Sequence, residues 1–179
     1  MSILLVSTCK ETLSEREFVH PISTILGSTE HQILHYSKCT KNTIKSFDKI
    51  IICGTSLKDN KYLENLDTFK KTFQKFSRPI LGICSGMQVV CSIFNGKIVQ
   101  NVEIGMTDSE TLESNELCTG KFQAYNMHTN SVDNLADFIV LAKNKNSIQV
   151  IKHKTKNIFG VSFHPEVRNE NIISNFIKI

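Results

Sequence analysis

Residues 80–88 read ILGICSGMQ and place one cysteine, Cys84, between Gly82 and Gly86. The apolar run before the cysteine is typical of a buried strand, and the apolar spacing after it is typical of a helix. A glycine two residues away on each side is the pattern of a nucleophile elbow, in which small neighbours make room for a strained backbone. The start of the following helix would favour a thiolate at this position. A glycine-rich turn around a buried cysteine is the alternative, and the motif alone does not separate the two.

The segments around this motif alternate between strand and helix patterns. Short apolar runs predict four buried strands, at residues 3–7, 32–36, 49–53 and 80–83. Apolar residues at helical spacing predict three helices, at residues 15–26, at 60–76 and from 85 to the Asn95–Gly96 pair. Strands that alternate with helices lie parallel and are joined by right-handed crossovers. The sequence therefore predicts an α/β fold with a doubly wound, mainly parallel sheet that has helices on both faces.

The second half of the chain has shorter strand patterns separated by polar turns. These strands are predicted at residues 97–100, 121–125, 138–143, 147–152 and 158–163, and a closing helix at 169–178. Turn residues between consecutive strands favour antiparallel pairing, so we expect a small antiparallel sheet beside the parallel one. With 179 residues, 40% of them hydrophobic, we expect residues 1–179 to form a single domain.

The composition argues against several classes of protein. The net charge is +4 and the lysines are scattered, so no nucleic-acid-binding surface is predicted. No apolar run approaches the roughly 20 residues of a membrane helix, and the amino-terminal apolar run is too short for a signal peptide. The six cysteines form no C-x-x-C pair and the histidines have no metal-site spacing, so we expect no metal. These features predict free thiols in a reducing, cytoplasmic compartment.

A second motif supplies the partners that a reactive thiol requires. Residues 159–167 read FGVSFHPEV, in which His164 ends a strand pattern, Pro165 stops the strand, and Glu166 follows two positions after the histidine. A nucleophilic thiol needs a base, and the base needs an orienting group that fixes its tautomer. Cys84, His164 and Glu166 are therefore predicted to form a catalytic triad. Open α/β sheets place such sites at the carboxyl ends of their strands, where the cysteine and the histidine both lie.

Both stretches resemble the motifs of one family. G-I-C-S-G-M-Q at residues 82–88 and F-H-P-E at 163–166 are similar to the nucleophile and histidine motifs of class I glutamine amidotransferases, in identity and in order. The resemblance extends from about residue 49 to the carboxyl end. Residues 151–167 most resemble the glutaminase subunit of archaeal-type GMP synthases, which is a short separate chain.

This resemblance implies a flavodoxin-like fold and a reaction. Cys84 would attack the side-chain amide of L-glutamine, His164 would protonate the leaving ammonia, and a γ-glutamyl thioester would form and be hydrolysed to glutamate. The ammonia would pass to a separate synthetase subunit of the ATP-pyrophosphatase type, for GMP synthesis. No cofactor is implied for this chain, because ATP and Mg²⁺ would belong to the synthetase partner.

The resemblance also implies the groups that surround the reacting sulfur. The backbone N–H groups of Ser85 and of the Gly54–Thr55 loop would stabilise the oxyanion of the tetrahedral intermediate. Substrate binding is implied for four further positions, namely Gln88, His128, Thr129 and Asn130. In the segment 128–130 the contact with glutamine would be made by the backbone.

One loop departs from the family pattern. The family usually has S-G-G-P after the third strand, whereas residues 53–56 read C-G-T-S, so Thr55 replaces a glycine. Threonine tolerates a positive φ poorly because its side chain is branched at Cβ. Two interpretations are open. The loop adopts an ordinary conformation and still presents the Thr55 N–H, or it is misaligned until a partner binds and the activity of the free chain is low.

Other functions are compatible with parts of the pattern. A different cysteine enzyme on a related sheet would place its histidine soon after the nucleophile, whereas His164 follows Cys84 by 80 residues (164 − 84). A catalytically weak or inactive protein that binds or regulates a partner would explain the altered loop. An amidotransferase that serves a different ammonia acceptor would carry the same motifs.

Overall fold

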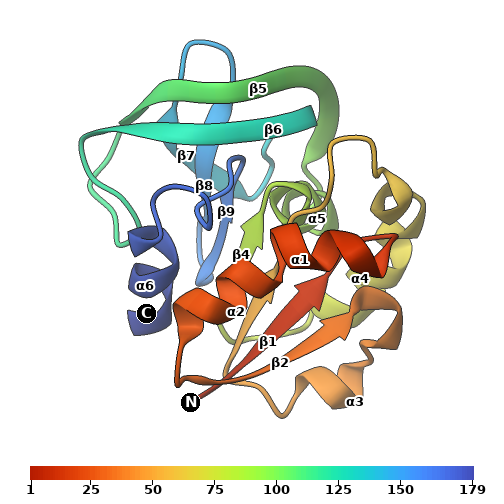
Figure 1. Ribbon diagram of the computed structural model, residues 1–179. Coiled ribbons are helices and arrows are strands. Elements are labelled where there is room, and N and C mark those ends of the chain that lie inside the picture. Colours follow the sequence, from red (N-terminus) through yellow and green to blue (C-terminus); the bar gives the residue numbers. More distant parts are fainter.

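In the computed structural model, which describes residues 1–179, nine strands form one curled sheet with helices on both sides (Figure 1). The strands are β1 (Ser2–Ser7), β2 (Glu30–His35), β3 (Lys49–Ile52), β4 (Ile80–Ile83), β5 (Lys97–Thr111), β6 (Lys121–Asp133), β7 (Phe138–Lys143), β8 (Ile148–His153) and β9 (Ile158–Val161). The α-helices are α1 (Glu15–Phe18), α2 (His20–Leu26), α3 (Lys41–Ile44), α4 (Leu66–Phe73), α5 (Ser85–Ile93) and α6 (Asn171–Lys178). Short 3₁₀ helices lie at Thr12–Ser14, Tyr36–Lys38 and Lys61–Asn65.

Alternation along the central strands divides the apolar core into two layers. Ile3 and Leu5 of β1 face one side of the sheet and pack in a cluster with α1, α2 and α6. Leu4 and Val6 face the other side and pack in a cluster with α3, α4 and α5. Successive side chains of a strand point to opposite faces, so a strand buried on both faces needs an unbroken apolar run. This is why the short apolar runs predicted the doubly wound α/β fold, which the structure confirms.

The sheet continues from parallel to antiparallel strands without a break. Its order is β2-β1-β3-β4-β9-β8-β7-β5-β6, with four parallel pairings among the first five strands and four antiparallel pairings from β9 onward. We expected a mainly parallel sheet and a separate small antiparallel one. Strand β9 joins the two, because it pairs with β4 on one edge and with β8 on the other.

Several predicted elements differ in extent from those observed. Strands β5 and β6 have 15 and 13 residues and form a long hairpin, where only 97–100 and 121–125 were predicted. Their middle parts carry polar residues such as Glu103 and Asn126 on the buried face, while apolar residues such as Val102 and Ile104 are exposed. The helix predicted at 15–26 is divided at Val19 into α1 and α2, because Pro21 in the first turn of α2 cannot donate to the preceding turn.

The cysteines agree with one further expectation. All six cysteines are free and buried, as small apolar residues would be. None of the helices is long and apolar enough to cross a bilayer.

Candidate active site

The predicted strand-to-helix turn is present at Cys84. Strand β4 is fully buried, and the next residue, Cys84, has φ 51° and ψ −108°, a strained conformation for a residue with a Cβ. A Cβ on Gly82 would lie 2.3 Å from the carbonyl oxygen of Gly86, and one on Gly86 would lie 2.0 Å from that of Ile52. Both glycines are therefore required by close backbone approach. The turn places the cysteine at the amino end of α5.

His164 and Glu166 lie just beyond the end of β9 and contact each other. Nδ1 of His164 is 2.8 Å from Oε1 of Glu166, and their side chains are 1% and 0% exposed. The backbone N–H of His164 donates to the carbonyl of Tyr125 on β6 at 2.9 Å. The Glu166 carboxylate accepts a hydrogen bond from Nδ1 and so fixes the orientation of the ring. Nε2 has no hydrogen-bond partner and is the nitrogen available for proton transfer.

The imidazole of His164 and the side chain of Cys84 both lie next to Gly54. A Cβ on Gly54 would lie 2.8 Å from Cε1 of His164 and 3.4 Å from Cβ of Cys84, so a side chain there would displace the histidine. Burial by itself disfavours the imidazolium, but Cys84 and Glu166 outweigh it and hold the pKa of His164 well above its usual value. These two neighbours therefore favour the protonated ring, the form that can donate a proton to a leaving group.

A small cavity of about 10 Å³ adjoins the cysteine. It brings together seven of the residues predicted from the sequence, namely Thr55, Cys84, Ser85, Gln88, His128, Thr129 and Asn130. A volume of this size holds about one water molecule. A glutamine side chain is larger than this volume.

Gln88 is held by residues from two sides of this cavity. Its Oε1 accepts from the hydroxyl of Tyr62, and its Nε2 donates to the carbonyl of Asn130 at 2.9 Å. The side chain of Asn130 donates in turn to Oδ1 of Asn60 at 3.0 Å. Residues 60–62 thus bridge to β6 across the cavity. The sequence did not single out Tyr62, although a buried tyrosine needs a partner for its hydroxyl, and burial raises its pKa so that it remains a donor.

The loop at Thr55 adopts an ordinary backbone conformation. Neither Gly54 nor Thr55 has a positive φ, so the threonine is accommodated without the strain considered for it. Its backbone N–H has no partner within the protein, and its hydroxyl donates to Asp59 at 2.7 Å. The same carboxylate accepts from the backbone N–H of Lys10 at 2.6 Å. The loop is therefore anchored by Asp59, with the Thr55 N–H left available beside the cavity.

Ser85 opens α5, where the first backbone N–H groups lack partners within the helix. Its hydroxyl lies 2.9 Å from that of Thr8 and donates to the carbonyl of Cys53 at 3.3 Å. These contacts hold the first turn of the helix against the ends of β1 and β3. The Ser85 N–H therefore lies at the amino end of α5, next to Cys84.

His128 lines the cavity but makes its side-chain contacts in the β5–β6 hairpin. Its Nδ1 is 3.1 Å from the carbonyl oxygen of Asn101, and its Nε2 is 3.5 Å from Oε2 of Glu103. Burial lowers the pKa of His128. The imidazole is therefore held by the hairpin, while Thr129 and Asn130 line the cavity.

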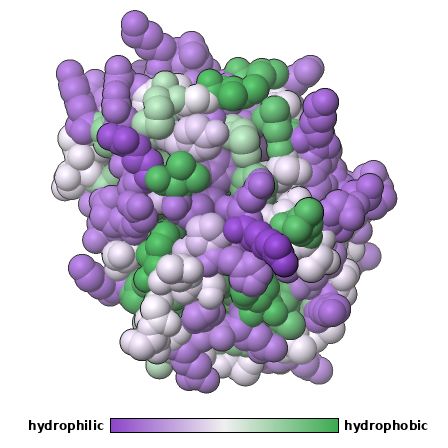
Figure 2. Space-filling view, in the orientation of Figure 1, coloured by the Kyte–Doolittle hydropathy of each residue, from purple (hydrophilic) through white to green (hydrophobic).

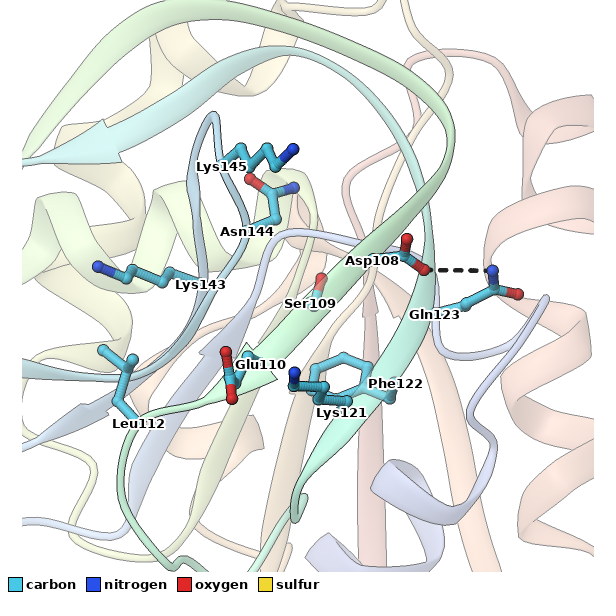
Figure 3. Close-up of a pocket in the computed structure, with 10 residues that line it drawn as sticks. All are labelled: Asp108, Ser109, Glu110, Leu112, Lys121, Phe122, Gln123, Lys143, Asn144 and Lys145. Atoms are coloured by element: carbon cyan, nitrogen blue, oxygen red, sulfur yellow. Dashed lines mark hydrogen bonds between the residues drawn. The ribbon is translucent and has the colours of Figure 1, made fainter.

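A more spacious cavity lies elsewhere in the molecule. It has a volume of about 750 Å³ and is lined by β5, β6 and the end of β7, with Lys121, Lys143 and Lys145 among its side chains (Figure 3). None of the residues predicted for the site lies in it. The small cavity is instead lined by Cys84, Ser85 and Thr55, and His164 is not among its lining residues.

The chain belongs to the class I glutamine amidotransferase family, whose model matches residues 16–178. Among its relatives, a subunit of the glutamine-hydrolyzing GMP synthase of Pyrococcus abyssi is 34% identical over 126 residues, which are 64% of this chain and 67% of that protein. The GMP synthase of Borreliella burgdorferi is 34% identical over 164 residues, which are 85% of this chain but only 32% of that longer protein. This chain therefore corresponds to about a third of the longer relative.

Solved structures show the same fold. A GMP synthase subunit-like protein of Thermoplasma acidophilum superposes with a TM-score of 0.88 at 23% identity, over 99% of this chain and 92% of the other. A glutamine amidotransferase of Thermotoga maritima gives a TM-score of 0.72 at 16% identity, over 99% of this chain and 81% of the other. At these identities the likeness establishes the fold alone.

Proposed function

We propose that this chain hydrolyses L-glutamine to glutamate and ammonia through a γ-glutamyl thioester on Cys84. The observation that carries the proposal is the strained turn at Cys84, with φ 51°, next to the buried His164–Glu166 pair. Strain of this kind persists where the surrounding structure enforces it, and it clusters at reactive positions. Membership of the amidotransferase family supports the same reaction.

The proposed steps use groups that lie within reach of one another. The sulfur of Cys84 attacks the side-chain carbonyl carbon of glutamine, and the protonated imidazole of His164 gives its proton to the amide nitrogen, which leaves as ammonia. Water then attacks the thioester while His164 takes its proton, and glutamate leaves as the C–S bond breaks. Glu166 holds Nδ1 throughout, so that Nε2 serves both proton transfers.

Two backbone groups and a side chain complete the proposed site. The N–H groups of Ser85 and Thr55 donate to the oxyanion, and Gln88 with the backbone of residues 128–130 binds the substrate. The small cavity supports a gated site, because the free chain offers about 10 Å³ beside the thiol. We therefore propose that opening of the loop around Thr55 precedes substrate binding.

We further propose that the ammonia passes to a separate synthetase subunit for GMP synthesis, with ATP and Mg²⁺ bound by that partner. The names of the relatives support this acceptor. An exposed apolar row on β5, formed by Val102, Ile104 and Met106, supports a partner surface. Ile104 pairs with Met127, which lines the cavity, and Figure 2 shows hydrophobic surface over the region of β5. We place this function in the cytoplasm and assign it to the whole chain as one domain.

The test is glutamate release from glutamine by the purified chain, alone and with a GMP synthase synthetase subunit, ATP, Mg²⁺ and xanthosine monophosphate. Cys84→Ala is the matched control, since it removes only the sulfur. We expect little release by the chain alone and a large increase with the synthetase. Labelling of Cys84 by a glutamine-like chloroketone reports the pocket independently of the acceptor.

The outcomes separate the remaining alternatives. Full activity of the free chain would show that the loop needs no partner to open. Labelling of Cys84 without activity in either mixture would indicate a different ammonia acceptor. Absence of both turnover and labelling would contradict the proposed reaction and favour a regulatory or partner-binding role.

A further inference from the structure

The edge strand β6 supplies backbone groups to three residues of the candidate site. The carbonyl of Tyr125 accepts from the His164 backbone at 2.9 Å, that of Met127 from the Cys84 thiol at 3.8 Å, and that of Asn130 from the Gln88 amide at 2.9 Å. Strand β6 is the last strand of the sheet, so no further strand fixes its position from that side. Whatever holds β6 in place also sets the geometry of these three contacts.

A buried carboxylate lies next to β6, outside the proposed mechanism. Glu103 of β5 pairs with His128 in the hairpin and is only 6% exposed. Its Oε1 accepts from Asn144 at 2.6 Å, and its Oε2 accepts from Ser147 at 2.7 Å and from Gln149 at 3.2 Å. Nε2 of His128 lies 3.5 Å from the same Oε2. Glu103 therefore joins the hairpin to the β7–β8 turn and to β8.

The same network reaches the segment between the end of β9 and His164. Nδ2 of Asn126 on β6 donates to the side chains of Thr107 at 2.7 Å and Gln149 at 3.2 Å. Its Oδ1 accepts from the hydroxyl of Ser162 at 3.4 Å. Ser162 lies two residues before His164. Both even-numbered side chains of β6 that flank Met127 are thus tied into one polar layer.

A β-bulge brings Glu103 to this position. The β5–β6 register shifts between Gln100 and Glu103, and within the bulge the carbonyl of Asn101 faces Nδ1 of His128. Bulges redirect side chains next to active sites. Glu103 makes no ion pair with a lysine or arginine, and a buried carboxylate without one adds little to stability. Its contacts with four polar neighbours are therefore better explained by positioning of the hairpin than by stabilisation of the fold.

We propose that Glu103 is a positioning residue for the glutamine site, which acts through His128 and Gln149 to hold the backbone of residues 125–130 against Cys84, His164 and Gln88. This proposal rests on the function proposed for the same site. The outer end of the network reaches the surface at Asn144, which Figure 3 shows among the side chains that line the spacious cavity.

The test compares Glu103→Gln with Glu110→Gln. Both remove one negative charge from β5, but Glu110 is exposed and has no part in the network. Two alkylating reagents are used on Cys84: a glutamine-like chloroketone, which must fit the pocket, and iodoacetamide, which reports the thiol alone. We expect Glu103→Gln to slow the chloroketone about tenfold and iodoacetamide less than about twofold. Glu110→Gln should change neither, and Glu103→Asp should recover part of the chloroketone rate.

A second measurement is independent of glutamine chemistry. Amide hydrogen exchange of residues 125–130 should become roughly tenfold faster in Glu103→Gln, while that of β4 stays unchanged. Equal slowing with both alkylating reagents, or unchanged exchange together with unchanged chloroketone labelling, would overturn the positioning role. If the wild-type chain is neither active nor labelled by the chloroketone, the proposed function fails. The exchange of residues 125–130 then decides on its own whether Glu103 positions β6.

Discussion

The two halves of the sheet hold their parts of the site by different means. In the parallel half, Cys84 is placed by backbone packing: apolar strands are buried on both faces, and Gly82 and Gly86 permit an approach that no other residue could make. In the antiparallel half, the strand beside the site is held by polar side chains around Glu103 and Asn126. The first arrangement is rigid and intolerant of added atoms, whereas the second depends on hydrogen bonds that a single charge change can weaken.

The largest expected effect is at Cys84, where two substitutions distinguish loss of the nucleophile from relief of backbone strain. Cys84→Ala should lower glutamine turnover at least about a thousandfold, because the nucleophile is removed, while the strained φ remains. Cys84→Gly should be equally inactive but about 1 kcal/mol more stable than Cys84→Ala, because glycine adopts φ 51° freely. Turnover and urea unfolding of both variants check this. Equal stability of the two would mean that the turn is not strained.

The second prediction tests packing of the parallel half. Gly86→Ala should lower the free energy of unfolding by about 3 kcal/mol or more, because the added Cβ would meet the Ile52 carbonyl at 2.0 Å. Neither backbone can move without displacing a buried strand. Urea unfolding measures the loss, and Ser92→Ala, a half-buried position on the same helix, is the control. A loss below about 1 kcal/mol would show that the elbow can relax and that the parallel half is not the more rigid one.

The third prediction concerns the pair that joins the two halves. Glu166→Gln should lower kcat about tenfold to a hundredfold, less than loss of the nucleophile, because the residue orients His164 and does not react. Removing the carboxylate also removes a cause of the raised pKa of His164. Loss of activity at high pH follows deprotonation of this ring, so the basic limb of the kcat profile should move to lower pH. An unmoved limb would mean that Glu166 does not set the charge of the imidazole.

The same difference explains what the sequence could and could not reveal. Apolar runs and glycine spacing are local patterns, so the central strands, the turn at Cys84 and the adjacent His164–Glu166 pair could all be predicted. The polar layer could not, because Glu103 and its partners at 144–149 are more than 40 residues apart and each alone resembles a surface residue. The polar residues on the buried face of β5 and β6 hid the length of these strands for the same reason. Tyr62 went unnoticed because its partner, Gln88, lies on another element.

The smallest expected effect lies at the loop that follows β3. Thr55→Val keeps the shape of the side chain and the backbone N–H but removes the hydrogen bond to Asp59. We expect a loss of about 1 kcal/mol in unfolding free energy. The loop should open more often, so iodoacetamide should label Cys84 roughly threefold faster.

Thr55→Ser, which retains the hydroxyl, is the matched control and should label at the wild-type rate. Turnover with the synthetase partner should fall less than about threefold in Thr55→Val, because the proposed oxyanion donor is the backbone and not the side chain. Faster labelling with preserved turnover would show that the hydrogen bond between Thr55 and Asp59 limits access to Cys84. Access would then be controlled by a polar contact like those of the antiparallel half. Unchanged labelling would mean that the apolar packing of the parallel half keeps the cavity closed. The hydrogen bond between Thr55 and Asp59 would then be a result of the closed loop conformation and not its cause.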